Sequence, residues 1–212
     1  MKQVFLIIAS LALLLSACTG NTRKDDAKAG TSVVTNQPGD MPHDSQQTMS
    51  GTMGQTTGIS SISVKRSQTV SDAISAYLEI EDALVTDDGS KSAEAGKNLV
   101  TALNNVDKSS VTDGKISELE KIIEDAIENA DHISENKRDI EHQREHFEML
   151  GTDIKDLVAI AGADRTLYQI FCPMYNKNEG GTWLSASSEI KNPFFGNKML
   201  TCGSVESVIS VR

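Results

Sequence analysis

Apolar residues between Val70 and Val158 recur every three or four positions, which is the period of amphipathic helices. Four such stripes follow one another along the chain and are separated by short polar connections such as Asp87-Asp88-Gly89. The stripes comprise Val70, Ile74, Tyr77 or Leu78, and Leu84; Leu99, Leu103 and Val106; Ile116, Leu119, Ile123, Ala126 or Ile127, Ala130 and Ile133; and Ile140, Phe147, Leu150, Ile154, and Leu157 or Val158. Because helices joined by short connections pack antiparallel, residues 67–164 are predicted to form a four-helix antiparallel bundle.

The pattern changes after Asp164. Leu167–Cys172 is rich in aromatic and branched residues, Trp183–Ser185 follows a turn-like segment, and Val205–Val211 is again branched, so each is predicted to be a short strand. Residues 165–212 are too few to stand alone, and we expect this tail to pack against the bundle as part of the same domain. The expected fold class is mainly α, with a small C-terminal β/loop tail.

The first residues have the character of an export signal. Met1-Lys2 precedes an apolar run from Val4 to Leu15, which is too short to span a bilayer. The run ends in Leu15-Ser16-Ala17-Cys18, which resembles a bacterial lipobox. Residues 1–17 are therefore predicted to be a lipoprotein signal peptide and Cys18 the lipidated residue. Thr19 after the cysteine favours an outer-membrane lipoprotein, whose domain would face either the periplasm or the cell surface. The alternative is an ordinary signal peptide that contains a cysteine.

Residues 18–66 are predicted to be a disordered linker behind the acylated cysteine, because they are polar and show no apolar periodicity. Met41, His43, Met49 and Met53 stand out within it, and thioether and imidazole groups are ligands for soft or borderline metals. They are interpreted as a mobile arm for metal capture. The alternative is that these methionines occur there by chance.

Charge narrows the classes of function. The formal net charge is −10, and residues 67–164 contain 23 acidic against 9 basic residues. A protein that binds duplex nucleic acid usually presents a basic face, so nucleic acid is not expected as a partner. The charged residues fall mostly off the apolar stripes, which indicates a solvated surface on the helices.

Two pairs of soft ligands lie in the tail: Cys172 with Met174, and Met199 with Cys202. Positions i and i+2 share a face of a strand, and positions i and i+3 share a face of a helical turn. Thiolates and thioethers favour Cu(I), so the four side chains are a candidate copper cage. The alternative is a plain Cys172–Cys202 disulfide, which is the default for two cysteines in an oxidising compartment.

Histidines on the fourth helix are a further candidate. His142, His146 and Met149 are spaced i, i+4 and i+7 and share a face that borders the apolar stripe. If the tail docks beside this face, His146 is the best additional ligand for the sulfur site. The alternative is a solvated histidine pair between acidic neighbours, and His132 on the third helix is equally open to both interpretations.

A series of motifs over about residues 67–207 resembles an uncharacterised domain family of bacterial envelope lipoproteins, which is also found at the end of some copper/silver efflux adaptor proteins. The resemblance implies a helical bundle with a Cys/Met tail and a role in copper handling. Cys-Pro-Met is also similar to a motif of short heavy-metal-binding modules, which commonly place a histidine directly after it. This chain has Tyr175 at that position and so departs from the pattern of those modules. The motifs are Gln143-Arg144-Glu145-His146-Phe147, Cys172-Pro173-Met174, Trp183-Leu184-Ser185, Ile190-Lys191-Asn192-Pro193-Phe194-Phe195-Gly196 and Lys198-Met199-Leu200-Thr201-Cys202-Gly203.

The sequence contains no Gly-rich phosphate loop, no Gly-x-Ser-x-Gly elbow and no His-Glu-x-x-His zinc helix, so an enzyme is not expected. The predicted function is a lipid-anchored envelope protein that binds a soft metal, Cu(I), for sequestration or hand-off to an efflux component. The alternative is a structural or interaction lipoprotein module with a Cys172–Cys202 disulfide and no metal.

Overall fold

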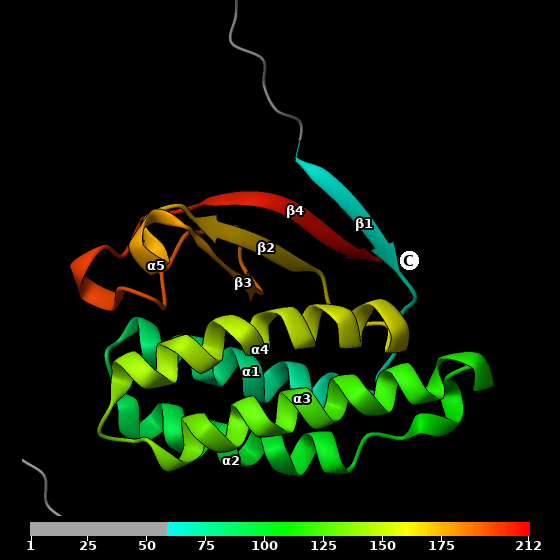
Figure 1. The fold of residues 1–212 in the computed structure, drawn as a ribbon. Helices are drawn as coiled ribbons and strands as arrows, with labels where there is room; N and C mark the ends of the chain where they lie inside the picture. Colours follow the sequence, from blue (N-terminus) through cyan, green and yellow to red (C-terminus); the bar gives the residue numbers. More distant parts are fainter. Residues whose placement is uncertain (1–58) are drawn as a thin grey trace, which may run out of the picture. The chain divides into compact units, whose positions relative to one another are not determined.

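The structure, a computed structural model, describes residues 59–212 (Figure 1). A first strand is followed by four long helices, and the rest of a small sheet comes from the C-terminal part of the chain. The helices and strands are β1 Ser60–Val64, α1 Ser71–Val85, α2 Gly89–Asn104, α3 Ile116–Glu135, α4 Ile140–Ala161, β2 Leu167–Cys172, α5 Tyr175–Asn178, β3 Gly181–Ser185 and β4 Ser204–Val211, with short 3-10 turns η1 Lys108–Ser110, η2 Asp113–Lys115 and η3 Gly196–Lys198.

The long helices pack through the predicted apolar stripes. Each contacts the next along the chain, and α1 also contacts α4, which is the neighbour pattern expected of the predicted bundle. On α3 the buried residues of the stripe are Leu119, Ile123, Ala126, Ala130 and Ile133, and Ile127 is partly buried. Aspartates cap two of the helices: the side chain of Asp88 accepts a hydrogen bond from the Lys91 backbone N–H, and that of Asp139 accepts one from the His142 backbone N–H.

The four strands form one sheet in the order β1-β4-β2-β3. β2 pairs antiparallel with both β3 and β4, and the three strands predicted from the sequence are all present. β1 is a difference from the sequence prediction, because Ser60–Val64 lies within the segment interpreted as a linker. It forms a parallel edge strand on β4, with Ser60 opposite Ser207 and Val64 opposite Val211.

The sheet packs on the helices through β3, which contacts α4 and α1 (Figure 1). Trp183 is completely buried, and the Tyr77 hydroxyl accepts a hydrogen bond from the Leu184 backbone N–H. Gly151 on α4 permits the close approach, because a Cβ there would lie 3.2 Å from the Thr182 carbonyl oxygen. The mainly α class with a small C-terminal sheet is therefore confirmed.

Within residues 59–212, no helix has both the length and the apolar character needed to cross a membrane.

Candidate metal sites

The sulfur atoms of Cys172 and Cys202 lie 2.7 Å apart, although they are 30 positions apart in the sequence. Cys172 is the last residue of β2 and is buried, whereas Cys202 lies in the turn before β4 and is partly exposed. Both are free cysteines. The structure therefore brings together the two cysteines that both interpretations of the tail require.

Asn192 fixes the loop that carries Cys202. It is fully buried, and its side-chain Nδ2 donates to the Cys202 carbonyl oxygen at 2.6 Å. Its Oδ1 accepts from the backbone N–H groups of Phe194 and Phe195, and its own backbone N–H donates to the Leu200 carbonyl oxygen. The hydrogen bonds of Asn192 in the Asn-Pro-Phe-Phe motif thus hold the loop in the position that places Cys202 beside Cys172.

Met174 does not share a strand face with Cys172, contrary to the predicted alternation. β2 ends at Cys172, and Pro173, which has no N–H to continue the ladder, leads into a turn. The Met174 side chain is 50% exposed. Met174 nevertheless follows Cys172 by only two residues, so its backbone stays near the sulfur pair.

Met199 lies in the predicted turn with Cys202, because the Cys202 backbone N–H donates to the Met199 carbonyl oxygen at 3.1 Å. Its side chain is partly exposed. Partial burial and the adjacent Cys172 thiol raise the pKa of Cys202. Metal binding at this pair would therefore have to displace protons from thiols.

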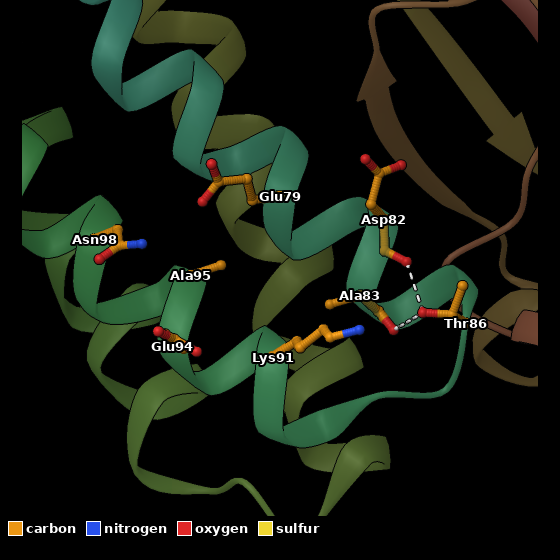
Figure 2. A pocket seen from close by; sticks show the side chains of 8 residues that line it. All are labelled: Glu79, Asp82, Ala83, Thr86, Lys91, Glu94, Ala95 and Asn98. Atoms are coloured by element: carbon orange, nitrogen blue, oxygen red, sulfur yellow. Dashed lines mark hydrogen bonds between the residues drawn. The ribbon is translucent and has the colours of Figure 1, made fainter.

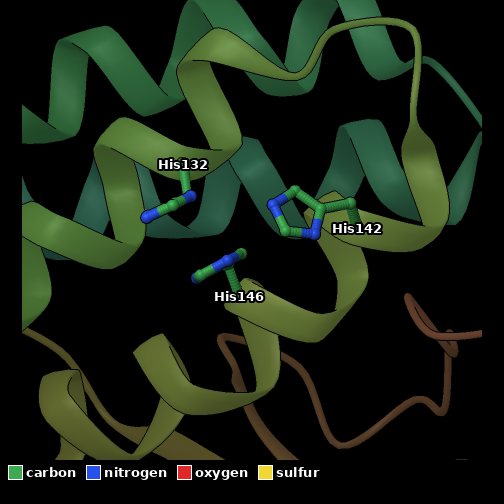
Figure 3. Close-up of side chains that lie close together, drawn as sticks. All are labelled: His132, His142 and His146. Atoms are coloured by element: carbon green, nitrogen blue, oxygen red, sulfur yellow. The ribbon is translucent and has the colours of Figure 1, made fainter. Parts of the chain in front are cut away.

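Three histidines meet between α3 and α4 (Figure 3). His132 projects from α3, and His142 and His146 project from successive turns of α4. The rings of His132 and His146 are stacked, with centroids 4.1 Å apart, and His142 meets His146 edge-on at 4.6 Å. Burial lowers the pKa of His146, and the neighbouring His132 and His142 lower it further.

His146 was predicted to join the sulfur ligands, but the structure places it in a cluster with two other histidines. Within residues 59–212, one group of three or more His, Cys, Asp or Glu residues has all its ligand atoms within 4.8 Å of one another, and it consists of the three histidines. Neither cysteine belongs to it. Met149, predicted to share the histidine face, is 43% exposed.

Arg144 is a buried cation, an exception to the solvated surface expected for most charged residues of the helices. It is 1% exposed, its Nε donates to the Pro193 carbonyl oxygen at 2.8 Å, and its Nη2 donates to the Leu84 carbonyl oxygen at 3.1 Å. It also pairs with Asp87 and Glu141. Arg144 therefore ties α4 to the end of α1 and to the loop that holds Cys202.

Glu81 is a second buried charged residue that the sequence pattern did not reveal. Its side chain lies between α1 and β3, where its Oε1 accepts a hydrogen bond from the Trp183 indole N–H at 3.2 Å. Burial raises the pKa of Glu81 to about 8, although hydrogen bonds from Ser185 and Trp183 oppose this. It lies on the helix side of the sheet, and we assign it a structural role.

An open groove between α1 and α2 has a volume of about 460 Å³ (Figure 2). It contains three carboxylates and one lysine but no cysteine, histidine or methionine, so it is unrelated to the candidate metal ligands. Its lining residues are Glu79, Asp82, Ala83, Thr86, Lys91, Glu94, Ala95 and Asn98.

The predictions for the N-terminal part of the chain lie outside the described residues. They are the lipidated Cys18 and the capture-arm residues Met41, His43, Met49 and Met53.

Residues 73–166 match the model of a family described as "Protein of unknown function (DUF3347)". This supports an uncharacterised domain over most of the helical part, including the three histidines but not the two cysteines. No curated protein and no solved structure matches the chain.

Proposed function

We propose that this protein binds Cu(I) through Cys172 and Cys202, for sequestration or hand-off to a copper/silver efflux component. The observation that carries the proposal is the 2.7 Å approach of two free thiols from opposite ends of the β2–β4 connection. Two sulfurs bound to one ion at about 2.3 Å are separated by roughly 3.8 Å or more, so the pair would open by about 1 Å to take up an ion. Thiolates favour a soft monovalent ion over a hard cation. Copper in this proposal is the cargo of the protein.

Met174 and Met199 are the proposed additional ligands. Met199 accepts a hydrogen bond from the Cys202 backbone N–H, and Met174 follows Cys172 by two residues. Neither methionine side chain is locked in the core. Methionine has three rotatable bonds and a polarisable sulfur, so each thioether can rotate toward an ion at the sulfur pair. An exchangeable thioether shell fits a protein that passes its ion to a partner.

The proposed setting is the outer membrane, reached through lipidation at Cys18. Several acyl chains on one residue give stable anchoring, whereas a single chain would be marginal. Met41, His43, Met49 and Met53 would then act as a capture arm between the membrane and the domain. The family resemblance of the Cys-Pro-Met and Met-Leu-Thr-Cys-Gly motifs supports this setting.

The same sulfur contact favours a second candidate, an interaction module in which Cys172 and Cys202 form a disulfide. The two candidates are mutually exclusive, because an oxidised pair offers no thiolate. They also predict different consequences of reduction. Reduction prepares the metal site in the first candidate, whereas in the second it removes a cross-link that stabilises the tail.

Cu(I) titration of the reduced full chain against a colorimetric chelator tests the proposal. We expect Cys172→Ser and Cys202→Ser to weaken Cu(I) binding by more than about tenfold, or about 1.4 kcal/mol. Met174→Ala and Met199→Ala should weaken it less. Met149→Ala is the matched control, since Met149 is a similarly exposed methionine on α4, and it should bind as the parent does.

Equal affinity in the parent and both serine variants would overturn the copper proposal. A thiol assay on the unreduced protein completes the comparison. If both tail thiols are blocked and reduction lowers the free energy of unfolding without creating a Cu(I) site, the interaction module is the correct alternative.

A further inference from the structure

The three histidines between α3 and α4 lie close enough together to form a metal site. Their ligand nitrogens all lie within 4.8 Å of one another. Nitrogens that bind one tetrahedral Zn²⁺ at the usual Zn–N distance are separated by about 3.4 Å. Rotation of the three partly buried side chains, which must also separate the stacked rings of His132 and His146, would bring the three nitrogens onto one ion.

Asn129 determines which nitrogen of His146 is available. The Asn129 Nδ2 donates to the Asp125 carbonyl oxygen at 3.2 Å and to the Asp153 carboxylate at 2.9 Å. Its Oδ1 therefore faces His146 Nδ1, at 2.9 Å, as an acceptor. Nδ1 of His146 carries the proton, and the lone pair of Nε2 is left for a ligand.

His142 has a similar outer partner, because its Nδ1 lies 3.4 Å from a carboxylate oxygen of Glu145. Metal-binding histidines commonly donate their second ring N–H to a carboxylate or carbonyl group, which fixes the tautomer and increases ligand basicity. Asn129 backed by Asp153, together with Glu145, supplies such a shell for both histidines of α4. These carboxylates also offset the charge of a bound cation.

We propose that His132, His142 and His146 form a second metal site, separate from the sulfur pair, for a divalent ion of intermediate softness such as Zn²⁺. Imidazole suits Zn²⁺, whereas thiolate and thioether ligands select Cu(I). Three protein ligands leave one coordination position open. Because all three histidines are only partly buried, the bound ion would be exchangeable with solvent.

The site has a consequence for the helices that carry it. His132 belongs to α3 and the other two histidines to α4, so one ion would cross-link two helices. An ion that binds the folded chain and not the unfolded chain raises the apparent stability. We therefore expect Zn²⁺ to raise the unfolding temperature of the parent protein and to leave that of a His132→Ala variant nearly unchanged.

Co²⁺ and Zn²⁺ titrations of the full chain test the inference independently of copper. In the Cys172→Ser/Cys202→Ser double variant, Co²⁺ should still give the visible bands of a tetrahedral site but no near-ultraviolet sulfur-to-cobalt band. His132→Ala, His142→Ala and His146→Ala should each weaken Zn²⁺ binding by more than about tenfold. Glu124→Ala, at an exposed position of α3, is the control and should bind with unchanged affinity.

Asn129→Ala tests the outer partner, with an expected loss of about tenfold to a hundredfold in Zn²⁺ affinity. Circular dichroism would establish that each variant is folded, and His146→Gln replaces His146→Ala if the smaller residue disrupts α4. Unchanged Zn²⁺ affinity in the folded histidine variants overturns the inference. Cobalt bands that disappear in the cysteine double variant also overturn it, because the ion would then be bound by sulfur.

The two proposals fail separately. Loss of Cu(I) binding in the serine variants with retained Zn²⁺ binding supports both sites. Cu(I) binding that does not depend on cysteine would contradict only the proposed function, whereas Zn²⁺ binding that does not depend on histidine would contradict only the three-histidine site.

Discussion

Glu81 shows how burial changes the behaviour of a single carboxyl group in this protein. The side chain is 5% exposed between α1 and β3, and burial raises its pKa to about 8. The folded state therefore binds a proton that the unfolded state, with an ordinary glutamate, releases near pH 4.5. The stabilising effect of this proton is fully present below pH 4.5 and is lost as the pH rises to about 8.

Glu81→Gln should remove this contribution, because glutamine is a neutral side chain of the same size. We expect the variant and the parent to have similar stability near pH 4.5 and the variant to be more stable above pH 8. Each unit of difference in pKa between the two states corresponds to about 1.4 kcal/mol. Urea unfolding across this pH range measures the difference, and parallel stability curves for the two proteins would contradict the assignment.

At the scale of the element, the helices were predictable and the geometry of the sulfur ligands was only partly so. The stripe from Ile140 to Leu157 repeats at helical spacing, and α4 spans Ile140–Ala161. The face predicted for Met174 was wrong because it depended on a strand that continued past Pro173. Arg144 was missed because the helical period shows which side is apolar but not which charged residue lies under a loop.

Asn192 offers a test of how the loop positions Cys202. Asn192→Ala removes three side-chain hydrogen bonds from a buried position. At about 1 kcal/mol each, the loss of stability should be about 3 kcal/mol. The loosened loop should also expose Cys202 to faster alkylation, which thiol-reactive reagents measure.

Asn197→Ala is the matched control for this change. Asn197 is exposed in the same loop, and its Nδ2 donates to the Asp87 carboxylate. Its replacement should leave the alkylation rate of Cys202 unchanged. Equal rates of Cys202 alkylation in the parent and in Asn192→Ala would show that the hydrogen bonds of Asn192 do not control access to the sulfur pair.

At the scale of the whole molecule, the contacts that matter join segments whose pairing the sequence does not reveal. His142 and His146 could be placed on one face from their spacing, but the approach of His132 depends on the relative position of α3 and α4 along their interface. β1 was missed for the same reason: its partner β4 lies near the opposite end of the chain. Local periodicity carries no information on such distant pairings.

Val64 tests whether β1 belongs to the folded domain. Val64 is 7% exposed and is part of the core, whereas its neighbour Ser63 is exposed. Val64→Asp would bury an unpaired charge and should destabilise the domain by on the order of 2–3 kcal/mol. Ser63→Asp should change the free energy of unfolding by less than about 0.5 kcal/mol, and similar values for both variants would mean that β1 is dispensable.

The parallel pairing of β1 with β4 also determines how the domain resists a mechanical pull from its N-terminal side. Force applied to residue 59 along the strand would slide β1 lengthwise past β4, whose chain runs in the same direction. The slanted, evenly spaced hydrogen bonds of a parallel ladder would share that load, and none would be peeled open first. A pull on residue 59 along the strand axis, opposed at the C-terminal end of β4, would thus load this ladder in shear rather than open it one bond at a time.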